Sequence, residues 1–180
     1  MVAGAGEAGS GLNTREMLTT PLKGYLLWDV EPEFDLANPA LAMQALEAAE
    51  SVVAVSAFSG DGLKTVADII LPLAPLAESE GLFYSLDGQA FEVEAAASLS
   101  GQARPGWKIL RRLGAELELD GFSQVDLASI RAEMLVETGQ DGKPATGVEM
   151  AAPTVESDFY RVGDVAMYSV DALCRRSDYL

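Results

Sequence analysis

Histidine is missing from this chain of 180 residues, and cysteine occurs only once, as Cys174. Without histidine there is no Ser-His-Asp triad, and the commonest general base and the usual zinc or iron ligand are lost as well. A single cysteine excludes an internal disulfide framework and any iron–sulfur cluster held by the thiolates of this chain alone. Catalysis by these residues would therefore depend on carboxylates or on a borrowed cofactor.

Basic residues are also scarce, since 12 lysines and arginines face 28 aspartates and glutamates, for a formal net charge of -16. A surface of this sign repels phosphate backbones and anionic lipids, so we expect no nucleic-acid partner. No apolar run approaches the roughly 20 residues of a membrane-spanning helix, and residues 1–13 lack the basic and apolar regions of a secretory signal. We therefore expect a cytoplasmic chain with no direct membrane insertion.

What the chain does contain is enough apolar material for a core, because 49% of its residues are hydrophobic. Apolar runs over 22–30, 51–58 and 67–71 predict three strands, the first of them buried, and the period over 39–50 predicts a helix. This order predicts an α/β fold with a partial parallel, Rossmann-like sheet flanked by helices, which binds ligands at the carboxyl ends of its strands. The apolar face of the helix would consist of Ala42, Ala45, Leu46 and Ala49.

Beyond the sheet, residues 82–96 predict a small β-hairpin, because Asp87 and Gly88 form a strong turn signal in which glycine supplies the positive φ. A helix is predicted over 105–119, with proline at its start. The apolar side of that helix would carry Trp107, Ile109, Leu110, Leu113 and Leu117.

The C-terminal third has weaker patterns. Residues 124–136 are compatible with one more amphipathic helix, 138–157 resemble a linker, and 159–180 show no clean period. We therefore divide the chain into a glycine-rich irregular segment at 1–21, an α/β domain at 22–122, and a helix, linker and extended C-terminal tail at 123–180.

The N-terminal segment contains the letters of a dinucleotide-binding G-x-G-x-x-G at Gly4, Gly6 and Gly9, and Asp29 follows about 20 residues later. A working fingerprint needs a strand before it and a helix after it, because the phosphate binds at the helix N-terminus. Only three residues precede this motif, and Pro21 breaks the segment that follows. We favour an irregular glycine-rich loop.

Four carboxylates alternate after the first predicted strand: Asp29, Glu31, Glu33 and Asp35. Oxygen clusters of this kind can hold Ca²⁺ or Mg²⁺. The spacing matches no EF-hand, however, and Pro32 restricts how the side chains could converge. We favour a solvated acidic loop or part of an interface.

Two further charged groups have a functional and an ordinary interpretation. Glu78 and Glu80 are spaced for an acid–base pair, but loop glutamates without a nucleophile are more often surface residues, and Glu78 is the better candidate for a structural hydrogen bond. Lys108, Arg111 and Arg112 form a small basic patch on one helix, for which a solvated helix face is the ordinary interpretation.

The remaining candidates are aromatic or reactive side chains. Trp28 and Trp107 lie in apolar runs, which favours core packing, although Trp107 would anchor an interface if half exposed. Cys174 precedes Arg175 and Arg176, an arrangement that can lower a thiol pKa, although nothing else in the sequence supports a reactive cysteine.

Four segments carry a family resemblance. Residues 67–81, ADIILPLAPLAESEG, resemble the A-D-V-x-L-P…E-x-E-G-T element of molybdopterin oxidoreductases, and 82–96, LFYSLDGQAFEVEAA, resemble their F-x-N-x-E-G-R-x-Q hairpin. Residues 101–122, GQARPGWKILRRLGAELELDGF, are similar to a G-E-A-R-P-x-W-x-x-L-x-x-L-G segment. That wording is closest to the largest peripheral-arm subunits of complex I, the NADH–quinone oxidoreductase, and 159–180 resemble a late segment of the same subunits.

In cofactor-bearing relatives, the resemblance implies, this hairpin helps to hold the pterin–guanine dinucleotide. Here the family's arginine is Gln89 and its glutamine is Phe91, so positive charge and donors for a pyrophosphate are lost. What survives are turn and packing residues, which indicates a retained scaffold. The positions of this degenerate pterin site are Glu78, Gly81, Leu82, Ser85, Asp87, Gly88, Gln89 and Phe91.

The resemblance implies a piece of the C-terminal region of the largest peripheral-arm subunit, with a structural or docking role and no catalytic residue, metal or cofactor of its own. The iron–sulfur clusters would lie in a part of the parent subunit absent here. Partners would be other peripheral-arm subunits, and membrane association would come through the complex. Two alternatives are a piece of a genuine molybdopterin-dependent enzyme, such as a formate dehydrogenase, and a free-standing interaction module.

Overall fold

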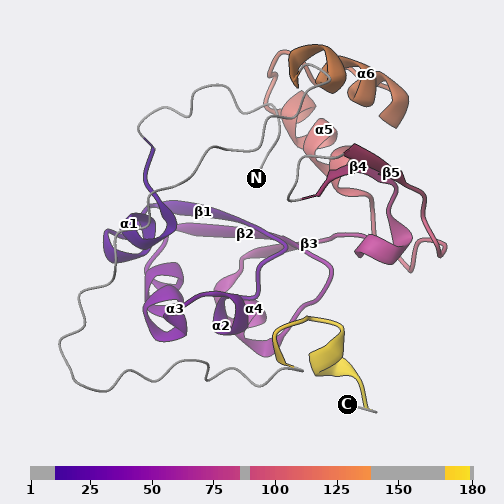
Figure 1. Cartoon of the computed structure of the whole chain (residues 1–180). Helices are drawn as coiled ribbons and strands as arrows, with labels where there is room; N and C mark the ends of the chain where they lie inside the picture. Colours follow the sequence, from indigo (N-terminus) through magenta and orange to yellow (C-terminus); the bar gives the residue numbers. More distant parts are fainter. Residues whose placement is uncertain (1–10, 86–89, 139–168, 179–180) are drawn as a thin grey trace, which may run out of the picture. The chain divides into compact units, whose positions relative to one another are not determined.

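The computed structural model describes residues 11–85, 90–138 and 169–178 (Figure 1). The chain divides into two compact units, residues 1–144 and 145–180, and each is described by itself. The described part of the second unit contains one short 3-10 helix, Cys174–Arg176. All other described helices and strands belong to the first unit.

A parallel three-stranded sheet organises the first unit. Its strands are β1 (Gly24–Trp28), β2 (Ser51–Ser56) and β3 (Ile69–Pro72), in the spatial order β1-β2-β3. Helix α3 (Pro39–Glu47) connects the first pair, and helix α4 (Asp61–Val66) connects the second. The predicted α/β class, with its parallel sheet, is therefore confirmed, as are all three predicted strands in shortened form.

Only the middle strand is buried. Val52, Ala54 and Val55 of β2 are at most 1% exposed, whereas Leu26 of β1 is 51% exposed and Ile69 of β3 is 53% exposed. The prediction of a buried first strand is wrong. An apolar run shows that a strand is hydrophobic, but burial on both faces also depends on neighbouring elements that lie far away in the sequence.

The core lies between the sheet and its connecting helices. Leu46 of α3, Val52 of β2 and Val66 of α4 form one buried cluster, to which Tyr25 and Leu27 of β1 add half-buried contacts. The predicted apolar face of α3 is confirmed at three of its four positions. The buried residues on that face are Ala42, Ala45 and Leu46.

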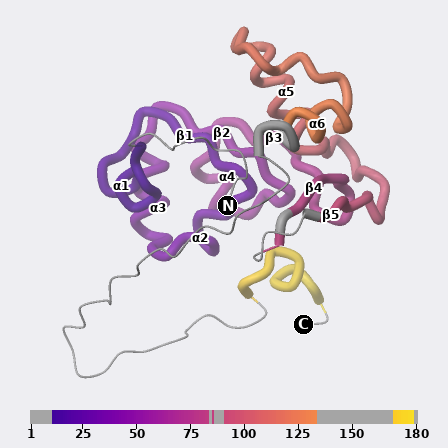
Figure 2. The backbone as a smooth tube through the Cα atoms, turned by 45° about the horizontal axis from the view of Figure 1, so that its top comes forward, coloured from indigo at the N-terminus to yellow at the C-terminus, as the bar shows by residue number. Residues whose placement is uncertain are grey.

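Two short helices were not predicted. Helix α1 (Thr14–Thr19) begins with a reciprocal capping box between Asn13 and Glu16, and contacts α3, beside which it lies in both Figure 1 and Figure 2. Helix α2 (Pro32–Asp35) occupies the region predicted as an acidic loop. Both have a single turn or slightly more, which is too short for a hydrophobic period to be recognised.

The predicted hairpin is confirmed in its strands: β4 (Gly81–Tyr84) pairs antiparallel with β5 (Ala90–Val93). Residues 86–89, which include the predicted turn, lie outside the described residues. A 3-10 helix, η1 (Leu76–Glu78), precedes the hairpin and connects it to β3.

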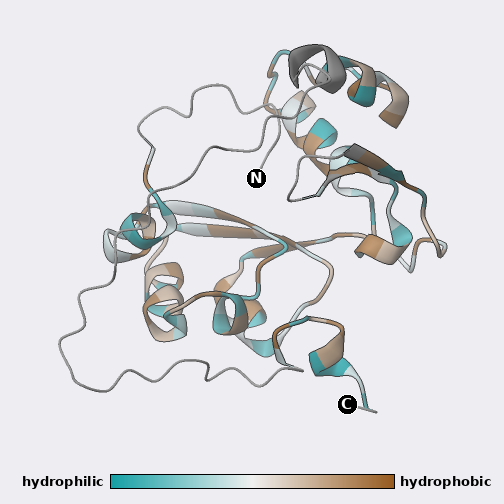
Figure 3. Ribbon diagram, in the orientation of Figure 1, coloured by the Kyte–Doolittle hydropathy of each residue, from teal (hydrophilic) through white to brown (hydrophobic). Residues whose placement is uncertain are grey.

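Helix α5 (Gly106–Glu116) confirms the helix predicted over 105–119, but its apolar side is only partly covered. Gly114, its one buried residue, packs against the ring of Phe122. Leu110 is 41% exposed and Leu117 is 60% exposed, and Figure 3 shows hydrophilic and hydrophobic patches along this helix. A period determines which residues share a side of a helix, but not whether another element covers that side.

Helix α6 (Leu127–Thr138) starts later than the predicted residue 124 because Asp126 caps it. The amide and the hydroxyl of Ser129 both donate to the Asp126 carboxylate, at 2.8 and 2.7 Å, and these bonds lower the pKa of Asp126. Val125 precedes the cap and is 76% exposed, so it does not contribute an apolar position to the helix predicted from residue 124. Within the described residues no helix is both long and apolar enough to cross a bilayer.

Leu46→Ala should reduce the free energy of unfolding by about 2–5 kcal/mol, because it opens a cavity in the core cluster where Leu46 is 2% exposed. Urea unfolding followed by circular dichroism measures the change. Leu76→Ala is the matched control, since Leu76 is 62% exposed and should cost less than about 1 kcal/mol. Equal losses for the two variants would contradict the location of the core.

Candidate functional site

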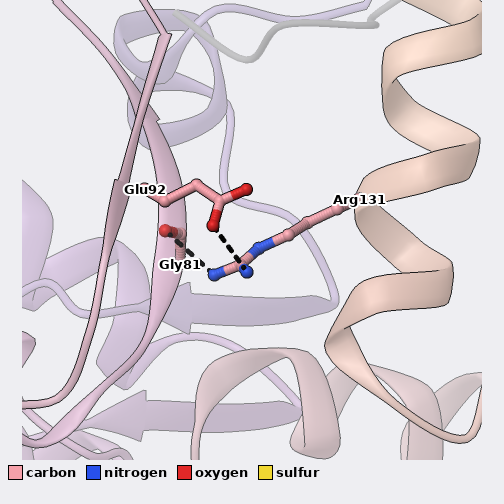
Figure 4. Close-up of polar contacts among 3 residues, drawn as sticks. All are labelled: Gly81, Glu92 and Arg131. Atoms are coloured by element: carbon pink, nitrogen blue, oxygen red, sulfur yellow. Dashed lines mark hydrogen bonds and ion pairs between the residues drawn. The ribbon is translucent and has the colours of Figure 1, made fainter.

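The hairpin is held by a single arginine from α6 (Figure 4). Nη1 of Arg131 lies 3.3 Å from a carboxylate oxygen of Glu92 on β5, and Nη2 donates to the carbonyl oxygen of Gly81 on β4, also at 3.3 Å. The arginine side chain is only 22% exposed. Because one guanidinium bridges both strands, we call these three residues the hairpin clamp.

Two of the positions predicted to form a degenerate pterin site, Leu82 and Phe91, lie within the described hairpin strands. The ring of Phe91 stacks on Phe83, with centroids 6.1 Å apart and planes inclined by 23°. Leu82 is half-buried in β4 and pairs with Glu92 across the ladder. Ser85 is exposed at the end of β4, and the remaining predicted positions, Asp87, Gly88 and Gln89, lie outside the described residues.

The predicted structural role of Glu78 is confirmed. Its carboxylate accepts a hydrogen bond of 2.8 Å from the backbone N–H of Ser100, which joins η1 to the segment after the hairpin. Glu80 is exposed. The pair thus has one carboxylate engaged with the backbone and one facing solvent, which is an arrangement for positioning a loop.

A groove of about 510 Å³ lies where β3 ends, and we call it the β3–α5 groove. Its apolar lining comes from Leu71 and Pro72 at the end of β3, and from Ile109 and Leu113 of α5. This is the carboxyl edge of the sheet, where ligands of open α/β folds bind. The charged lining residues are Arg104, Lys108, Arg112 and Glu116.

Backbone contacts fix both walls of the groove relative to each other. The N–H of Arg104 donates to the carbonyl of Pro72 at 3.1 Å, and its carbonyl accepts from the N–H of Ala74 at 2.9 Å, so this residue continues the sheet beyond β3. A Cβ on Gly106, at the start of α5, would lie 2.9 Å from the ring of Trp28. Glycine therefore lets the helix approach β1 closely.

The groove cations differ in their partners. Arg112 forms an ion pair with Glu116 one turn away. Nη1 of Arg104 donates to the carbonyl of Ala103 at 2.8 Å. Nζ of Lys108 lies 5.2 Å from the centroid of the Trp107 ring. Within the described residues, neither Arg104 nor Lys108 forms an ion pair with a carboxylate.

The cations of the groove differ by one residue from the predicted basic patch of Lys108, Arg111 and Arg112. Lys108 and Arg112 share the groove side of α5 because they are four residues apart, while Arg111 does not line the groove. Arg104 takes its place. Trp28 and Trp107 are both half-buried, so core packing accounts for only part of each side chain, and the interface role left open for Trp107 stays a prediction.

Two of the carboxylates of residues 29–35, for which a solvated loop or an interface was favoured over a Ca²⁺ or Mg²⁺ site, accept hydrogen bonds from backbone amides. Among the described residues no group of three or more acidic or cysteine side chains is placed to hold a metal ion. Asp29 accepts from the N–H of Ala57 at 3.4 Å, and Asp35 accepts from the N–H of Glu31 at 2.7 Å. Glu31 is the N-cap residue of α2 and is only 3% exposed, so this region is not wholly the solvated loop that was favoured. The glycine-rich motif at Gly4, Gly6 and Gly9 lies outside the described residues.

The predicted lowering of the Cys174 thiol pKa is wrong. Burial raises the pKa of this half-buried thiol, and the neighbouring Asp171 carboxylate raises it further. Asp171 accepts from the backbone N–H groups of Cys174 and Leu173, both at 2.9 Å, which lowers the pKa of the carboxylate. Burial first, and then the anion beside the sulfur, thus move the thiol pKa in the direction opposite to the predicted one.

Sequence reasoning missed Arg131 and Arg104. Arg131 is 39 residues from Glu92 and 50 from Gly81, so no local pattern connects them. Arg104 precedes a proline at the start of a predicted helix, and this position did carry a signal. The residue before proline favours extended backbone, and such backbone can add to a sheet.

Comparison with known proteins gives two findings. A family model described as molybdopterin oxidoreductase matches residues 3–116. The mitochondrial NADH-ubiquinone oxidoreductase 78 kDa subunit of Neurospora crassa is 39% identical over 70 residues. That match covers 37% of this chain and 9% of the relative, so the chain spans only a small part of the relative's length.

Arg131→Ala should loosen the hairpin, because both strands lose the shared guanidinium. With Glu92 67% exposed, we expect a local cost of about 1 kcal/mol, which is roughly a fivefold faster amide exchange in β4 and β5. Hydrogen–deuterium exchange with mass spectrometry measures it. Arg112→Ala removes an ion pair on α5 and should leave the hairpin amides unchanged. Unaltered exchange in Arg131→Ala would contradict the clamp.

Cys174 should be alkylated by iodoacetamide with a pH midpoint above that of the same protein in urea. The raised thiol pKa means that the reactive thiolate forms only at higher pH in the folded chain. Asp171→Asn, which removes the anion, should shift the midpoint back toward the unfolded value. A folded midpoint at or below the unfolded one would refute this assignment.

Proposed function

Because the chain belongs to the molybdopterin oxidoreductase family, we propose that it is a structural and docking part of a subunit of NADH–quinone oxidoreductase, complex I. The similarity to a 78 kDa subunit of such an oxidoreductase supports this assignment. By this proposal the chain corresponds to the C-terminal region of the largest peripheral-arm subunit. The parent complex passes electrons from NADH to quinone and couples this transfer to ion translocation.

One observation carries the structural role: the hairpin is built for packing. Phe91 stacks on Phe83 at a position where cofactor-bearing relatives have a glutamine. Arg131 forms an ion pair with Glu92 and donates a hydrogen bond to the Gly81 carbonyl. Anion binding by the hairpin would require donors that point outward. The clamp and the aromatic pair support a retained scaffold that holds no pterin.

The remaining parts of the proposal follow from this role. Electrons would travel through iron–sulfur clusters carried elsewhere in the parent subunit. The chain would contact other peripheral-arm subunits and would be associated with the membrane only through the complex. The groove and the exposed apolar side of α5, including Leu110 and Leu117, are surfaces that such contacts would use.

A second candidate is a piece of a molybdopterin-dependent enzyme of the formate dehydrogenase type. The family match over 3–116 favours it, because that family includes cofactor-bearing enzymes. The two candidates differ in metal and pterin content, which makes them separable by one purification.

We expect the complete protein, purified by a tag from its own cells, to bring down other NADH–quinone oxidoreductase subunits in equal amounts. It should contain no molybdenum by plasma mass spectrometry and no oxidised-pterin fluorescence assignable to this subunit. A formate dehydrogenase purified in parallel is the positive control for both assays. Near-stoichiometric molybdenum and pterin without these subunits would overturn the proposal and support the second candidate.

A further inference from the structure

We propose that the β3–α5 groove is the docking site for an acidic segment with apolar side chains from another subunit of the same complex. This inference rests on the proposed function and names the surface that would perform the docking. It concerns the groove defined by Leu71, Pro72, Ile109 and Leu113 with the cations Arg104, Lys108 and Arg112.

Charge complementarity identifies the chemistry of the partner. The chain has a net charge of -16 with only 12 basic residues, yet three of those residues line this one groove against a single acid. Glu116 is already paired with Arg112, which leaves Arg104 and Lys108 without a carboxylate among the described residues. An acidic segment would be repelled by most of the surface and attracted here, which fixes where it binds.

The apolar lining between the cations indicates that the partner segment also carries apolar side chains. Leu71, Ile109 and Leu113 are half-buried, so they are still partly accessible to another molecule. Burying apolar surface contributes about 25 cal/mol per Å², whereas exposed ion pairs alone contribute little. A partner that combines carboxylates with apolar side chains would use both parts of the groove.

The shape favours a polypeptide over a small molecule. Pockets for small ligands usually enclose about 70–90% of the ligand surface. Here Pro72, Arg104, Lys108 and Arg112 are all exposed, so the groove is open along its rim. Its walls are fixed by the backbone bonds of Arg104 and the close approach of Gly106 to Trp28, and such preorganisation lowers the entropic cost of binding.

The first test places the photo-crosslinker p-benzoylphenylalanine at Ile109, inside the groove, in the complete protein assembled in its complex. Val125, 76% exposed and outside the groove, is the matched control position. We expect irradiation at position 109 to join the chain to an acidic, apolar segment of another subunit, identified by mass spectrometry, and position 125 to give no such product.

The outcomes separate the two proposals. An assembled complex without a crosslink from position 109, or with a crosslink to a basic or uncharged segment, overturns the groove assignment and leaves the proposed function standing. A complete protein that assembles with no NADH–quinone oxidoreductase subunit overturns the proposed function, and the groove assignment falls with it.

The second test measures the binding of the crosslinked segment, made as a fluorescent peptide, to the isolated complete protein by anisotropy. Arg104→Glu/Lys108→Glu should weaken binding at least tenfold. The control Arg15→Glu/Arg111→Glu changes net charge equally at two cations outside the groove, and should change affinity less than twofold. Equal weakening would show that only net charge matters and would overturn the proposal.

Folding of the variants is checked by circular dichroism and thermal unfolding. If the double reversal is unfolded, the neutral variant Arg104→Gln/Lys108→Gln replaces it, with Arg15→Gln/Arg111→Gln as its control. The same criterion then applies: selective weakening by the groove variant supports the assignment, and equal weakening refutes it.

Discussion

The burial of β2 is the constraint on which the rest of the first unit depends. Val52, Ala54 and Val55 have a strand on either side, and Val52 belongs to the core cluster formed with α3 and α4. A one-residue slip of this strand would move its apolar side chains to the wrong face. The parallel register is therefore strongly specified. The register in turn determines where β1 and β3 end relative to β2. The groove forms at the end of β3, and Asp29, which accepts from the N–H of Ala57, follows the end of β1.

The backbone hydrogen bonds at the end of β3 fix the position of the elements that follow it in the first unit. Leu73 donates to the carbonyl of Ser56, and two further backbone bonds join Arg104 to Pro72 and Ala74, so α5 starts from a position set by the sheet. The hairpin, which lies in the chain between β3 and Arg104, is held by two other contacts. These are the hydrogen bond from Ser100 to Glu78 and the hairpin clamp of Arg131. In each contact a side chain binds a backbone group, the N–H of Ser100 in one and the carbonyl of Gly81 in the other.

The sequence predicted what depends on local order and missed what depends on distant neighbours. Strand and helix positions followed from periodicity, and the face of α3 was predicted because Ala42, Ala45 and Leu46 repeat at helical spacing. The exposure of β1 was missed because strand order is not a local property. The clamp joins residues far apart in the chain. The arginines beside Cys174 are apparent in the sequence. The effect of Asp171 on the thiol pKa is not, because it depends on a turn that brings the Asp171 carboxylate to two backbone amides.

The few cations of this acidic chain differ in how far their charge is already compensated. A guanidinium near the hairpin is the kind of group that would bind a pyrophosphate. Arg131, however, pairs with Glu92 and donates to a backbone carbonyl, so its charge is already compensated. Arg104 and Lys108 lie instead beside apolar side chains, with a backbone carbonyl and an aromatic ring as their neighbours. Those two contacts leave most of their charge available to an incoming carboxylate. Among the described residues, the cations best placed to attract an anion therefore lie at the end of β3 and not at the hairpin.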